Sequence, residues 1–464
     1  MQTVIDRQFF RRRRVLVVGL GVHGGGEATV RWLLRHRAVV RVTDQKTKTD
    51  LQSAVKKFTG RPVQWRLGGH HRGDFAWAEV IIQNPGVPDD LAALRWARRH
   101  DRLILNEAGL FFTLCPAAII GVTGTRGKTT TTTLIGRMLQ PTRGRVVVSG
   151  NIRRVAMLDY LDRLRATDTA VLELSSFQLE GLPQAARSPR LAVMTNLLVD
   201  HLNRYGSLQK YADAKHNIFR WQKPSDVAVL NATNAWSRRA ARLTPAQVWW
   251  FQRRGRRGLR GVTIERGWLT AYGSATSRIL PVSDIHVAGE HQQENILAAV
   301  TAGLAWGVPI RRIRQAVQKF AGVPHRQEQV RSWRGHEFIN DTTATTPDGT
   351  LAALAVFPRG VFILGGTDKQ LSFTALARVL HRRLIPVVWL PGSATTKLAQ
   401  ALRRAGDRRP VTPVDSMATA VRQAVAQAKS HQPIVLSPGA ASFGLFAHEF
   451  DRGEQFVRQV KALR

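Results

Sequence analysis

The sequence predicts an α/β protein with mostly parallel sheets and more than one domain. Short runs of valine, isoleucine and leucine alternate along the chain with segments of helical length and pattern, which is typical of parallel sheets covered by helices. Two of these runs lead directly into glycine-rich turns, at residues 19–24 and 121–127. Because 464 residues, 44% of them hydrophobic, exceed what a single core usually serves, we expect two or three domains.

We expect the first domain, residues 1–106, to be Rossmann-like. Gly19, Gly21 and Gly24 form a G-x-G-x-x-G pattern after an apolar run, and Asp44 ends the next run. Such a turn lets a helix N-terminus approach a diphosphate. The pattern alone is weak evidence for a nicotinamide cofactor, since glycines that only pack a strand against a helix look the same. The predicted elements are strands at Val15–Gly19, Val39–Thr43, Val80–Ile82 and Leu103–Leu105 and a helix at Glu27–His36.

The second domain, expected over residues 107–322, holds the most informative segment of the chain. An apolar strand at Ile119–Val122 enters T-G-T-R-G-K-T, residues 123–129, and a helical pattern follows. In such a loop, backbone N–H groups and the helix N-terminus bind phosphate oxygens. Lys128 adds a positive charge near the terminal phosphates, and the Thr129 hydroxyl can reach Mg²⁺. Further strands are predicted at Val146–Val148, Ala170–Leu174, Leu191–Thr195 and Val227–Leu230.

The α/β pattern restarts after Gly322, so we expect a third domain over residues 323–464, again Rossmann-like. Its predicted strands are Val361–Gly365, Val387–Leu390 and Ile434–Leu436, and its predicted helices are Phe373–His381, Thr396–Ala405 and Met417–Ala428.

The net charge of +37 is the most unusual property of the composition. Taken alone it suggests a nucleic acid or an anionic membrane as partner, but the arginines are spread along the chain. The densest block, Arg253–Gly261, lies between strand-like runs at Ala246–Phe251 and Gly261–Thr270. We interpret it as a solvated hairpin loop rather than a dedicated RNA site. The composition gives no physical account of the full excess of charge.

We expect a cytoplasmic protein that is a monomer and has neither a membrane nor a specific nucleic acid as partner. The composition supports the compartment and the absence of a membrane partner. Cys115 is the one cysteine, which excludes an intrachain disulfide and fits a reducing compartment. No stretch approaches the roughly 20 apolar residues that a membrane span requires. The basic segment Asp6–Arg14 and the short apolar run after it are interpreted as a first strand rather than a signal peptide.

Several motifs resemble those of the Mur ligases, the ATP-dependent amide-forming enzymes of peptidoglycan precursor synthesis. T-G-T-R-G-K-T is similar to the tight phosphate-binding loop of that family and of its folylpolyglutamate synthetase relatives. Further matches, to the D-glutamate-adding branch in particular, follow in order over nearly the whole chain. They are VLELSSFQL (171–179), NLLVDHLNR (196–204), YADAKHNIF (211–219), GVPHRQ (322–327), INDTTAT (339–345) and LSPGAASFGLFAHEFDRG (436–453).

The resemblance implies a reaction and its first substrate. The γ-phosphoryl group of ATP passes to the carboxylate of UDP-N-acetylmuramoyl-L-alanine, and the amine of glutamate then attacks the acyl phosphate. In the family the first domain holds the uridine diphosphate rather than a nicotinamide cofactor. The residues implied in binding this substrate are Gly21, Asp44, Gln45, Asn84, Gly86, Asn151 and Ser175.

The resemblance also implies the ATP and metal sites. ATP is expected at Gly124, Thr125, Gly127, Lys128, Thr129, Thr130 and Asn295, with His325, Arg326 and Asp341 brought to it by closure of the last domain. Two Mg²⁺ ions are expected at Thr129, Glu173, His201 and Lys215. Lys215 matches the family lysine that CO₂ carbamylates; the alternative is an ordinary lysine on a helix surface.

The amino acid pocket is expected at Thr345, Lys369 and Ser442, which match family positions that hold the carboxylates of the incoming amino acid. Two departures concern this pocket. Thr343 stands where the family has a lysine, and Glu449 stands where it has an aromatic residue, with Phe450 next to it. D-Glutamate is the expected substrate, and L-glutamate or another acidic amino acid remain alternatives.

Two other functions fit parts of the sequence. One is another ligase of the superfamily, such as a folate-extending enzyme, against which the Rossmann-like first domain argues. The other is a nucleic-acid-binding ATPase, which the charge and the phosphate-binding loop would support.

Overall fold

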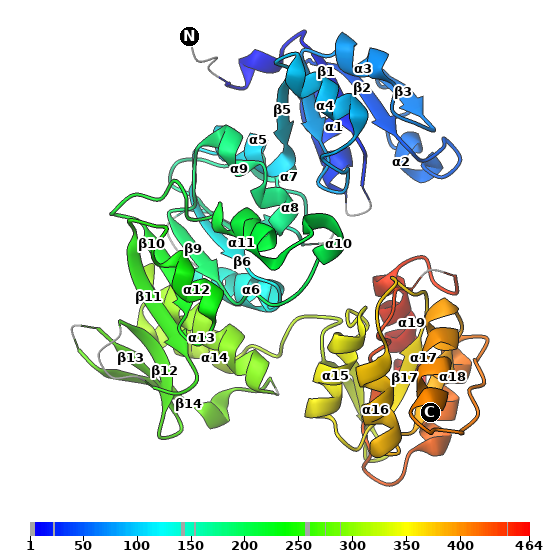
Figure 1. Cartoon of the computed structure of the whole chain (residues 1–464). Coiled ribbons are helices and arrows are strands. Elements are labelled where there is room, and N and C mark those ends of the chain that lie inside the picture. The colour runs from blue at the N-terminus through cyan, green and yellow to red at the C-terminus, as the bar shows by residue number, and fades with distance from the viewer. Residues whose placement is uncertain are drawn as a thin grey trace. The chain divides into compact units, whose positions relative to one another are not determined.

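The computed structural model describes residues 5–21, 24–140, 144–152, 155–255, 260–273, 275–287, 289–442 and 444–464. The chain divides into two compact units, and each is described by itself (Figure 1). The first consists of Met1–Ile285 and Glu290–Lys319, and the second of His286–Gly289 and Phe320–Arg464. The first unit contains two sheets and the second contains one, so the predicted α/β class is confirmed.

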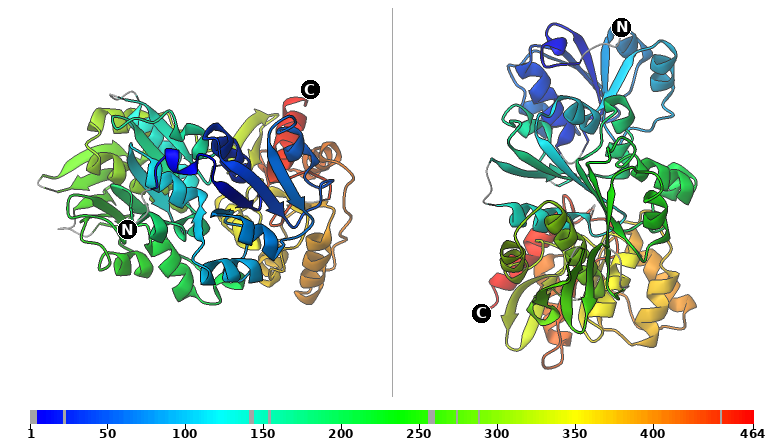
Figure 2. Two further views of the ribbon diagram at one scale, coloured as in Figure 1. Left: turned by 90° about the horizontal axis from the view of Figure 1, so that it is seen from above. Right: turned by 90° about the vertical axis from the view of Figure 1, so that its left-hand side faces the viewer.

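The N-terminal sheet has five parallel strands in the order β3-β2-β1-β4-β5, with helices on both faces (Figure 2). Side chains alternate along β1: Val15 and Val17 pack in one cluster with α1, whereas Leu16 and Val18 pack in another with α3 and α4. The elements are β1 (Arg14–Val18), α1 (Gly25–Arg35), β2 (Val39–Asp44), α2 (Gln52–Lys56), β3 (Val63–Leu67), α3 (Arg72–Trp77), β4 (Val80–Gln83), α4 (Ala92–Arg99), β5 (Leu103–Asn106) and α5 (Glu107–Leu114).

The central sheet has nine strands in the order β14-β13-β12-β11-β10-β9-β6-β8-β7. Neighbours from β7 to β12 pair in parallel, and β13 and β14 add antiparallel pairs. The elements are β6 (Ala118–Thr123), α6 (Lys128–Leu139), β7 (Val146–Gly150), α7 (Leu158–Leu161), β8 (Thr169–Glu173), α8 (Ser176–Leu179), α9 (Leu182–Ala185), β9 (Leu191–Met194), α10 (Leu202–Tyr205), α11 (Leu208–His216), β10 (Val227–Asn231), α12 (Ala235–Ala240), β11 (Gln247–Gln252), β12 (Gly261–Glu265), β13 (Trp268–Tyr272), β14 (Ser277–Pro281), α13 (Glu290–Ala305) and α14 (Ile310–Gln318).

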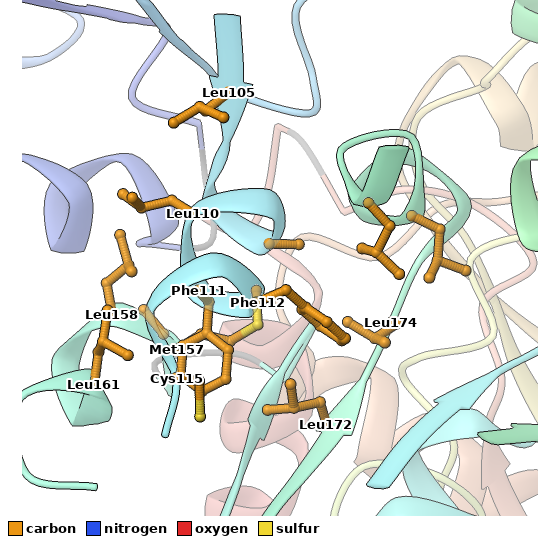
Figure 3. Close-up of a cluster of buried hydrophobic side chains, with 14 of the residues drawn as sticks. Leu105, Leu110, Phe111, Phe112, Cys115, Met157, Leu158, Leu161, Leu172 and Leu174 are labelled. Atoms are coloured by element: carbon orange, nitrogen blue, oxygen red, sulfur yellow. The ribbon is translucent and has the colours of Figure 1, made fainter. Parts of the chain in front are cut away.

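Helix α5 joins the two sheets of the first unit through one continuous hydrophobic cluster (Figure 3). Phe111 lies toward Met157 of the segment before α7, and Phe112 lies toward Leu174 beyond β8. Cys115, directly after the helix, is 2% exposed in the same cluster. Because the cluster runs from the N-terminal sheet into the central sheet, α5 packs as part of both.

The second unit has one five-stranded sheet in the order β15-β16-β19-β17-β18, with β15 antiparallel to its neighbour. Val361 and Ile363 of β17 face the helices α18 and α19, and Phe362 and Leu364 face α15, α16 and α17. The elements are β15 (Glu328–Trp333), β16 (His336–Asn340), α15 (Pro347–Val356), β17 (Val361–Gly365), α16 (Thr374–Arg382), β18 (Val387–Leu390), α17 (Ser393–Arg404), α18 (Met417–Gln427), β19 (Ile434–Leu436) and α19 (Glu449–Lys461).

The hairpin predicted around the arginine block is wrong. Strands β11 and β12 pair in parallel, with Trp250 opposite Gly261, so the block is not a hairpin turn. Residues 256–259 of the block lie outside the described part of the chain. The run after the block is two antiparallel strands rather than one, because the chain turns at Arg266 and Gly267, which both have positive φ.

Within the described ranges, no helix is long and apolar enough to cross a bilayer.

Candidate active site

A cleft of about 560 Å³ opens within the first unit, at the carboxyl ends of parallel strands from both of its sheets. This is where α/β proteins usually bind ligands, because loops and helix N-termini converge there. Of the residues predicted from the sequence, the cleft is lined by Gly21, Asp44, Gln45, Asn84, Gly86, Thr125, Lys128, Asn151, Ser175, His201 and Lys215. The two halves of the predicted site therefore share one cavity.

The glycine turn after β1 lies directly against the loop after β4. Gly19 and Gly21 both have positive φ, and a Cβ on Gly21 would lie 2.7 Å from Asn84 Nδ2. Asp44 fixes the turn: its Oδ2 accepts from the backbone N–H of Leu20 at 2.9 Å, and its Oδ1 accepts from that of Lys46 at 3.0 Å. Glycine is required in this turn because a side chain would displace the opposite loop.

The side chain of Lys128 hydrogen-bonds to the backbone of the phosphate-binding loop. Lys128 is the first residue of α6, and its Nζ donates to the carbonyl oxygens of Gly124 (3.0 Å) and Thr125 (3.1 Å). Gly127 caps the helix with φ 85°, and a Cβ there would lie 1.9 Å from Asn295 Oδ1. Asn295, from α13, is thus packed onto the loop. Thr129 and Thr130 belong to the first turn of α6.

Glu173, at the carboxyl end of β8, is 2% exposed. Its Oε1 accepts from Asn151 Nδ2 at 3.1 Å, whereas its Oε2 is buried without a protein partner. A buried carboxylate oxygen without a partner is costly, and a hard cation would satisfy it. In the described part of the chain, no group of three or more His, Cys, Asp and Glu side chains is already gathered as a metal site.

Lys215 is a buried amine, so the alternative of a surface lysine on α11 is wrong. The residue is 1% exposed, its Nζ donates to the Gly124 carbonyl at 2.9 Å, and it lies 4.8 Å from the centre of the Tyr211 ring. Burial holds the pKa of Lys215 well below its usual value, and the nearby charge of Lys128 lowers it further. A neutral amine is the form that reacts with CO₂, so the direction of this shift favours the form that carbamylation needs.

His201 lies between two aromatic rings at the start of α10. Its ring is 5.0 Å from that of Phe177 and 5.7 Å from that of Tyr211, and its φ of 52° is left-handed. Burial lowers the pKa of His201, with a further decrease from Lys215 and Lys128, while Asp200 opposes the shift. A neutral imidazole can accept a metal ion.

In the second unit, the three residues predicted to hold the amino acid come from neighbouring loops. Lys369 Nζ donates to Thr345 Oγ1 at 3.1 Å. The backbones of Thr367 and Ala441 pair with each other, which brings the Lys369 loop beside Ser442. Ser442 is 4% exposed, and its buried Oγ has no protein partner.

The two departures from the family pattern have local explanations. Thr343 Oγ1 donates to the carbonyl of His325 at 3.0 Å, so this residue ties two loops together instead of presenting a charge. Glu449 begins α19, and its carbonyl accepts from Thr342 Oγ1 at 2.6 Å. The ring of Phe450 lies 5.6 Å from that of His325, so an aromatic side chain is present one residue later.

His325, Arg326 and Asp341 lie together in the second unit. Asp341 accepts from Ser437 Oγ at 2.8 Å and from the Gln327 N–H at 3.2 Å, and burial raises its pKa to about 7. His325 Nδ1 accepts from Asn340 Nδ2 at 2.9 Å, so its Nε2 carries the proton when the ring is neutral.

Sequence reasoning missed three groups near these sites. Phe177 and Tyr211 line the first cleft, and both lie inside motifs that were already recognised. Glu107 lines the same cleft, and the only signal for it was one acidic residue in an apolar run. In the second unit, Arg452 is fully buried and donates to the carbonyls of Thr342, Ala440 and Ala441, which joins the two loops that carry Thr345 and Ser442.

Three family models match the chain in order. Residues 13–105 match "Mur ligase MurD-like, N-terminal domain", residues 122–303 match "Mur ligase middle domain", and residues 325–440 match "Mur ligase, glutamate ligase domain".

Curated relatives match over nearly their full length. A UDP-N-acetylmuramoylalanine–D-glutamate ligase of Roseiflexus sp. (strain RS-1) is 41% identical over 460 residues, which are 97% of this chain and 98% of the relative. Enzymes of the same name from Symbiobacterium thermophilum and Koribacter versatilis are each 35% identical to this chain. The match covers 98% of each relative, and it covers 97% of this chain in the first case and 98% in the second.

Solved structures share the fold. UDP-N-acetylmuramate-alanine ligase MurC of Thermotoga maritima matches with a TM-score of 0.59 and 20% identity, covering 97% of this chain and 99% of that one. MurF ligase of the same organism, in complex with ADP, matches with a TM-score of 0.55 and 18% identity, covering 98% and 96%.

Proposed function

The chain belongs to the Mur ligase family, and we propose that it joins D-glutamate to UDP-N-acetylmuramoyl-L-alanine. It is an ATP-dependent ligase that forms an amide bond. In the proposed reaction, the γ-phosphoryl group of ATP is transferred to the alanine carboxylate. The amine of D-glutamate attacks the resulting acyl phosphate, loses a proton, and phosphate leaves as the amide forms.

The cleft described above carries this proposal. A nucleotide-binding glycine turn and a phosphate-binding loop line one cavity of about 560 Å³. A long substrate that enters with its uridine diphosphate at the turn would present its far carboxylate to the loop. An enzyme whose two nucleotide sites served unrelated ligands would not need them in one cavity.

The diphosphate end of the substrate would bind at Gly21, Asp44, Gln45, Asn84 and Gly86. The side chain of Asp44 accepts from the Leu20 N–H in the turn, and that of Asn84 accepts from the Gly86 N–H in the opposite loop. Because these bonds fix both loops, this end of the cleft would need little rearrangement to bind the substrate. Asn151 and Ser175 lie further along the cleft wall and would contact the part of the substrate nearest the reacting carboxylate.

The triphosphate of ATP would lie on the loop formed by Gly124, Thr125 and Gly127 and on the first turn of α6, with Thr129 and Thr130. Lys128 now donates to two loop carbonyls; on nucleotide binding it would turn its charge to the transferring phosphoryl group, whose negative charge grows in the transition state. Asn295 would meet the nucleotide from α13. From the last domain, Arg326 would add a second cation, and His325 and Asp341 would complete the site when the domain closes.

Two Mg²⁺ ions would bind donors from the first turn of α6, the carboxyl end of β8, the start of α10 and helix α11. Thr129 and Glu173 would hold one, and the unpartnered Glu173 Oε2 supports this assignment. His201 and Lys215 would hold the second, with Lys215 carbamylated so that a buried cation becomes an anion. The ions supply positive charge to the phosphoryl transfer, while the protein residues orient the phosphates and exclude water.

Lys369, Thr345 and Ser442 would bind the carboxylates of glutamate. A dicarboxylic amino acid needs donors for both groups, and a lysine with two hydroxyls provides them. We also propose three domains, at residues 1–106, 107–322 and 323–464, in a cytoplasmic monomer.

The test is a substrate panel. The protein is incubated with ATP, Mg²⁺ and UDP-N-acetylmuramoyl-L-alanine and with each of a set of D- and L-amino acids, and the products are identified by mass. We expect an adduct with D-glutamate and equimolar phosphate. An adduct with L-glutamate alone would change the stereochemical assignment. Coupling of a neutral or basic amino acid would refute the proposed pocket while leaving the ligase class intact.

A further inference from the structure

Glu107 is a buried acid in the wall of the cleft that the proposed reaction does not use. It is the first residue of α5, it is 8% exposed, and its Oε1 is buried without a hydrogen-bond partner. The backbone N–H groups of Met157 and Leu158 are directed at its carboxyl group. A carboxyl with an unsatisfied oxygen is costly to bury, so its presence at a ligand cavity points to a use in binding.

The carboxyl group of Glu107 lies against the start of α1. A Cβ on Gly25, the first residue of that helix, would lie 2.5 Å from Glu107 Oε2. Gly25 also lines the cleft, directly after the glycine turn. Since a helix N-terminus next to a glycine turn attracts phosphate oxygens, Glu107 lies where the diphosphate of the proposed substrate would be bound.

Among the residues that the structure describes, few charges surround this carboxyl group. Among the elements packed against α5, neither α8, α9 nor β5 carries a charged residue. Helix α7 contributes Asp159, and α1 contributes Glu27, Arg31 and Arg35. Arg31 binds both oxygens of Asp159, and Glu27 binds Lys57. These charges are largely neutralised by one another, and none forms an ion pair with Glu107 in the described part of the chain.

We propose that Glu107 binds the diphosphate of the substrate as a neutral carboxylic acid, donating its proton to a phosphate oxygen at the N-terminus of α1. This inference rests on the proposed function, because it requires that a nucleoside diphosphate occupies this end of the cleft. An ionised carboxylate would repel the phosphates, so substrate binding is linked to a proton on Glu107.

The protonation of Glu107 supports this role near neutral pH. Burial is the main cause that raises its pKa to about 7, and the charge of Asp159 adds to it, while the two backbone N–H groups oppose it. The acid is therefore protonated below pH 7 and ionises above it, and a bound phosphate would raise its pKa further. The affinity for the diphosphate is expected to fall as the pH rises above about 7, by at most about tenfold for each pH unit.

The experiment measures binding of UDP-N-acetylglucosamine to the full chain by calorimetry from about pH 5.5 to about pH 8.5. This probe carries the diphosphate, and its phosphates do not titrate in that range; uridine, which lacks the diphosphate, is the control ligand. Three proteins are compared: wild type, Glu107→Gln and Glu27→Gln. The amide introduced by Glu107→Gln keeps a donor that cannot ionise, and Glu27 is an acid on α1 that does not line the cleft.

We expect wild type and Glu27→Gln to lose affinity for the diphosphate probe above pH 7, with proton uptake on binding, and Glu107→Gln to bind it equally well across the range. Uridine should show no such loss with any of the three. His70 and His201 also line the cleft, but they are unchanged in all three proteins, so their titration cancels in the comparison.

The same loss in Glu107→Gln as in wild type would overturn the inference while leaving the proposed function standing. If none of the proteins bound the probe or uridine at any pH, the proposed function itself would fail. If Glu107→Gln did not fold, Glu107→Asp would replace it, and its profile is expected to shift along the pH axis rather than to vanish.

Discussion

At the scale of single residues, Lys215 shows how burial changes the preferred charge state of an amine. It is a fully buried lysine whose Nζ has one hydrogen-bond acceptor, the Gly124 carbonyl, and whose environment favours the uncharged amine. A free lysine gains little from such a site, whereas a carbamate there would face the metal ligands His201 and Glu173 that we propose.

Lys215→Ala is expected to lower ligation by at least about 10²-fold, the loss typical of removing one preorganised electrostatic group. Added acetate or formate should restore part of the activity by supplying the missing anion. Lys210→Ala, an exposed lysine on the same helix, is the matched control and should behave as wild type. Full activity of Lys215→Ala without any additive would remove the case for a carbamate.

Lys128→Ala is expected to abolish turnover, by roughly 10²-fold or more, while binding of UDP-N-acetylmuramoyl-L-alanine is retained. The reason is that Lys128, at the start of α6, would hold the phosphoryl group of ATP during transfer, whereas it is not among the residues proposed to bind the uridine diphosphate. Arg126→Ala, an exposed neighbour in the same loop, serves as control. Steady-state kinetics and substrate calorimetry separate the two effects, and near-normal turnover of Lys128→Ala would contradict the ATP site.

At the scale of elements, the loop between β6 and α6 depends on the close approach of α13. Gly127 has a positive φ, and there is no room for a Cβ between it and Asn295. The helix that carries Asn295 packs along α6, so loop and helix fit only when this residue is glycine.

Gly127→Ala is expected to weaken ATP binding by at least about tenfold, because it adds a clash with Asn295 to the strain of a positive φ. Gly60→Ala isolates the strain: Gly60 has φ 75°, and nothing lies within 4 Å of its Cβ position. Both variants should lose some thermal stability, but only Gly127→Ala should lose nucleotide affinity. Equal ATP affinity in the two variants would mean that Asn295 does not shape the site.

Most elements could be predicted from the sequence because apolar runs and glycine turns are local signals. Strands β3, β14, β15 and β16 were missed. In β3 and β15, polar residues interrupt the apolar pattern, as in Val63–Leu67. The parallel pairing of β11 and β12 could not be predicted, because strand direction depends on the whole sheet.

Most of the residues that line the cleft of the first unit lie in or next to motifs that were recognised in the sequence. By contrast, the buried states of Glu107 and Lys215 arise from packing between distant segments. Glu107 carries only the weak local signal of an apolar run around it, and the sequence around Lys215 gives none.

At the scale of the whole molecule, the net charge of +37 comes from residues in different environments. Arg253, the first residue of the arginine block, pairs with Glu290 and donates to Gln293 at 3.2 Å. Both partners are on α13, close to Asn295. Arg254 and Arg260 are exposed, so the block contains residues with different roles.

Replacing Arg254 and Arg260 together by Gln is expected to leave turnover nearly unchanged and to lower nonspecific RNA affinity, whose signature is a steep dependence on salt. Arg253→Gln is expected to raise the KM for ATP a few-fold, since α13 loses a contact near its N-terminus. Glu290→Gln should have the same effect, and a double variant should add little. Loss of turnover in the variant of Arg254 and Arg260 would show that these residues contribute to catalysis.

The lone thiol in the core between the two sheets gives the protein a built-in probe of its own unfolding. Burial is the main cause that raises the pKa of Cys115, so in the folded state it is both shielded and unreactive. A thiol reagent can therefore label the chain only when the region around α5 opens. The labelling rate, read by mass at increasing denaturant, should equal the rate at which the core shared by the two sheets of the first unit is lost. Saturating UDP-N-acetylmuramoyl-L-alanine, which would bind residues on both sides of that core, should slow the labelling.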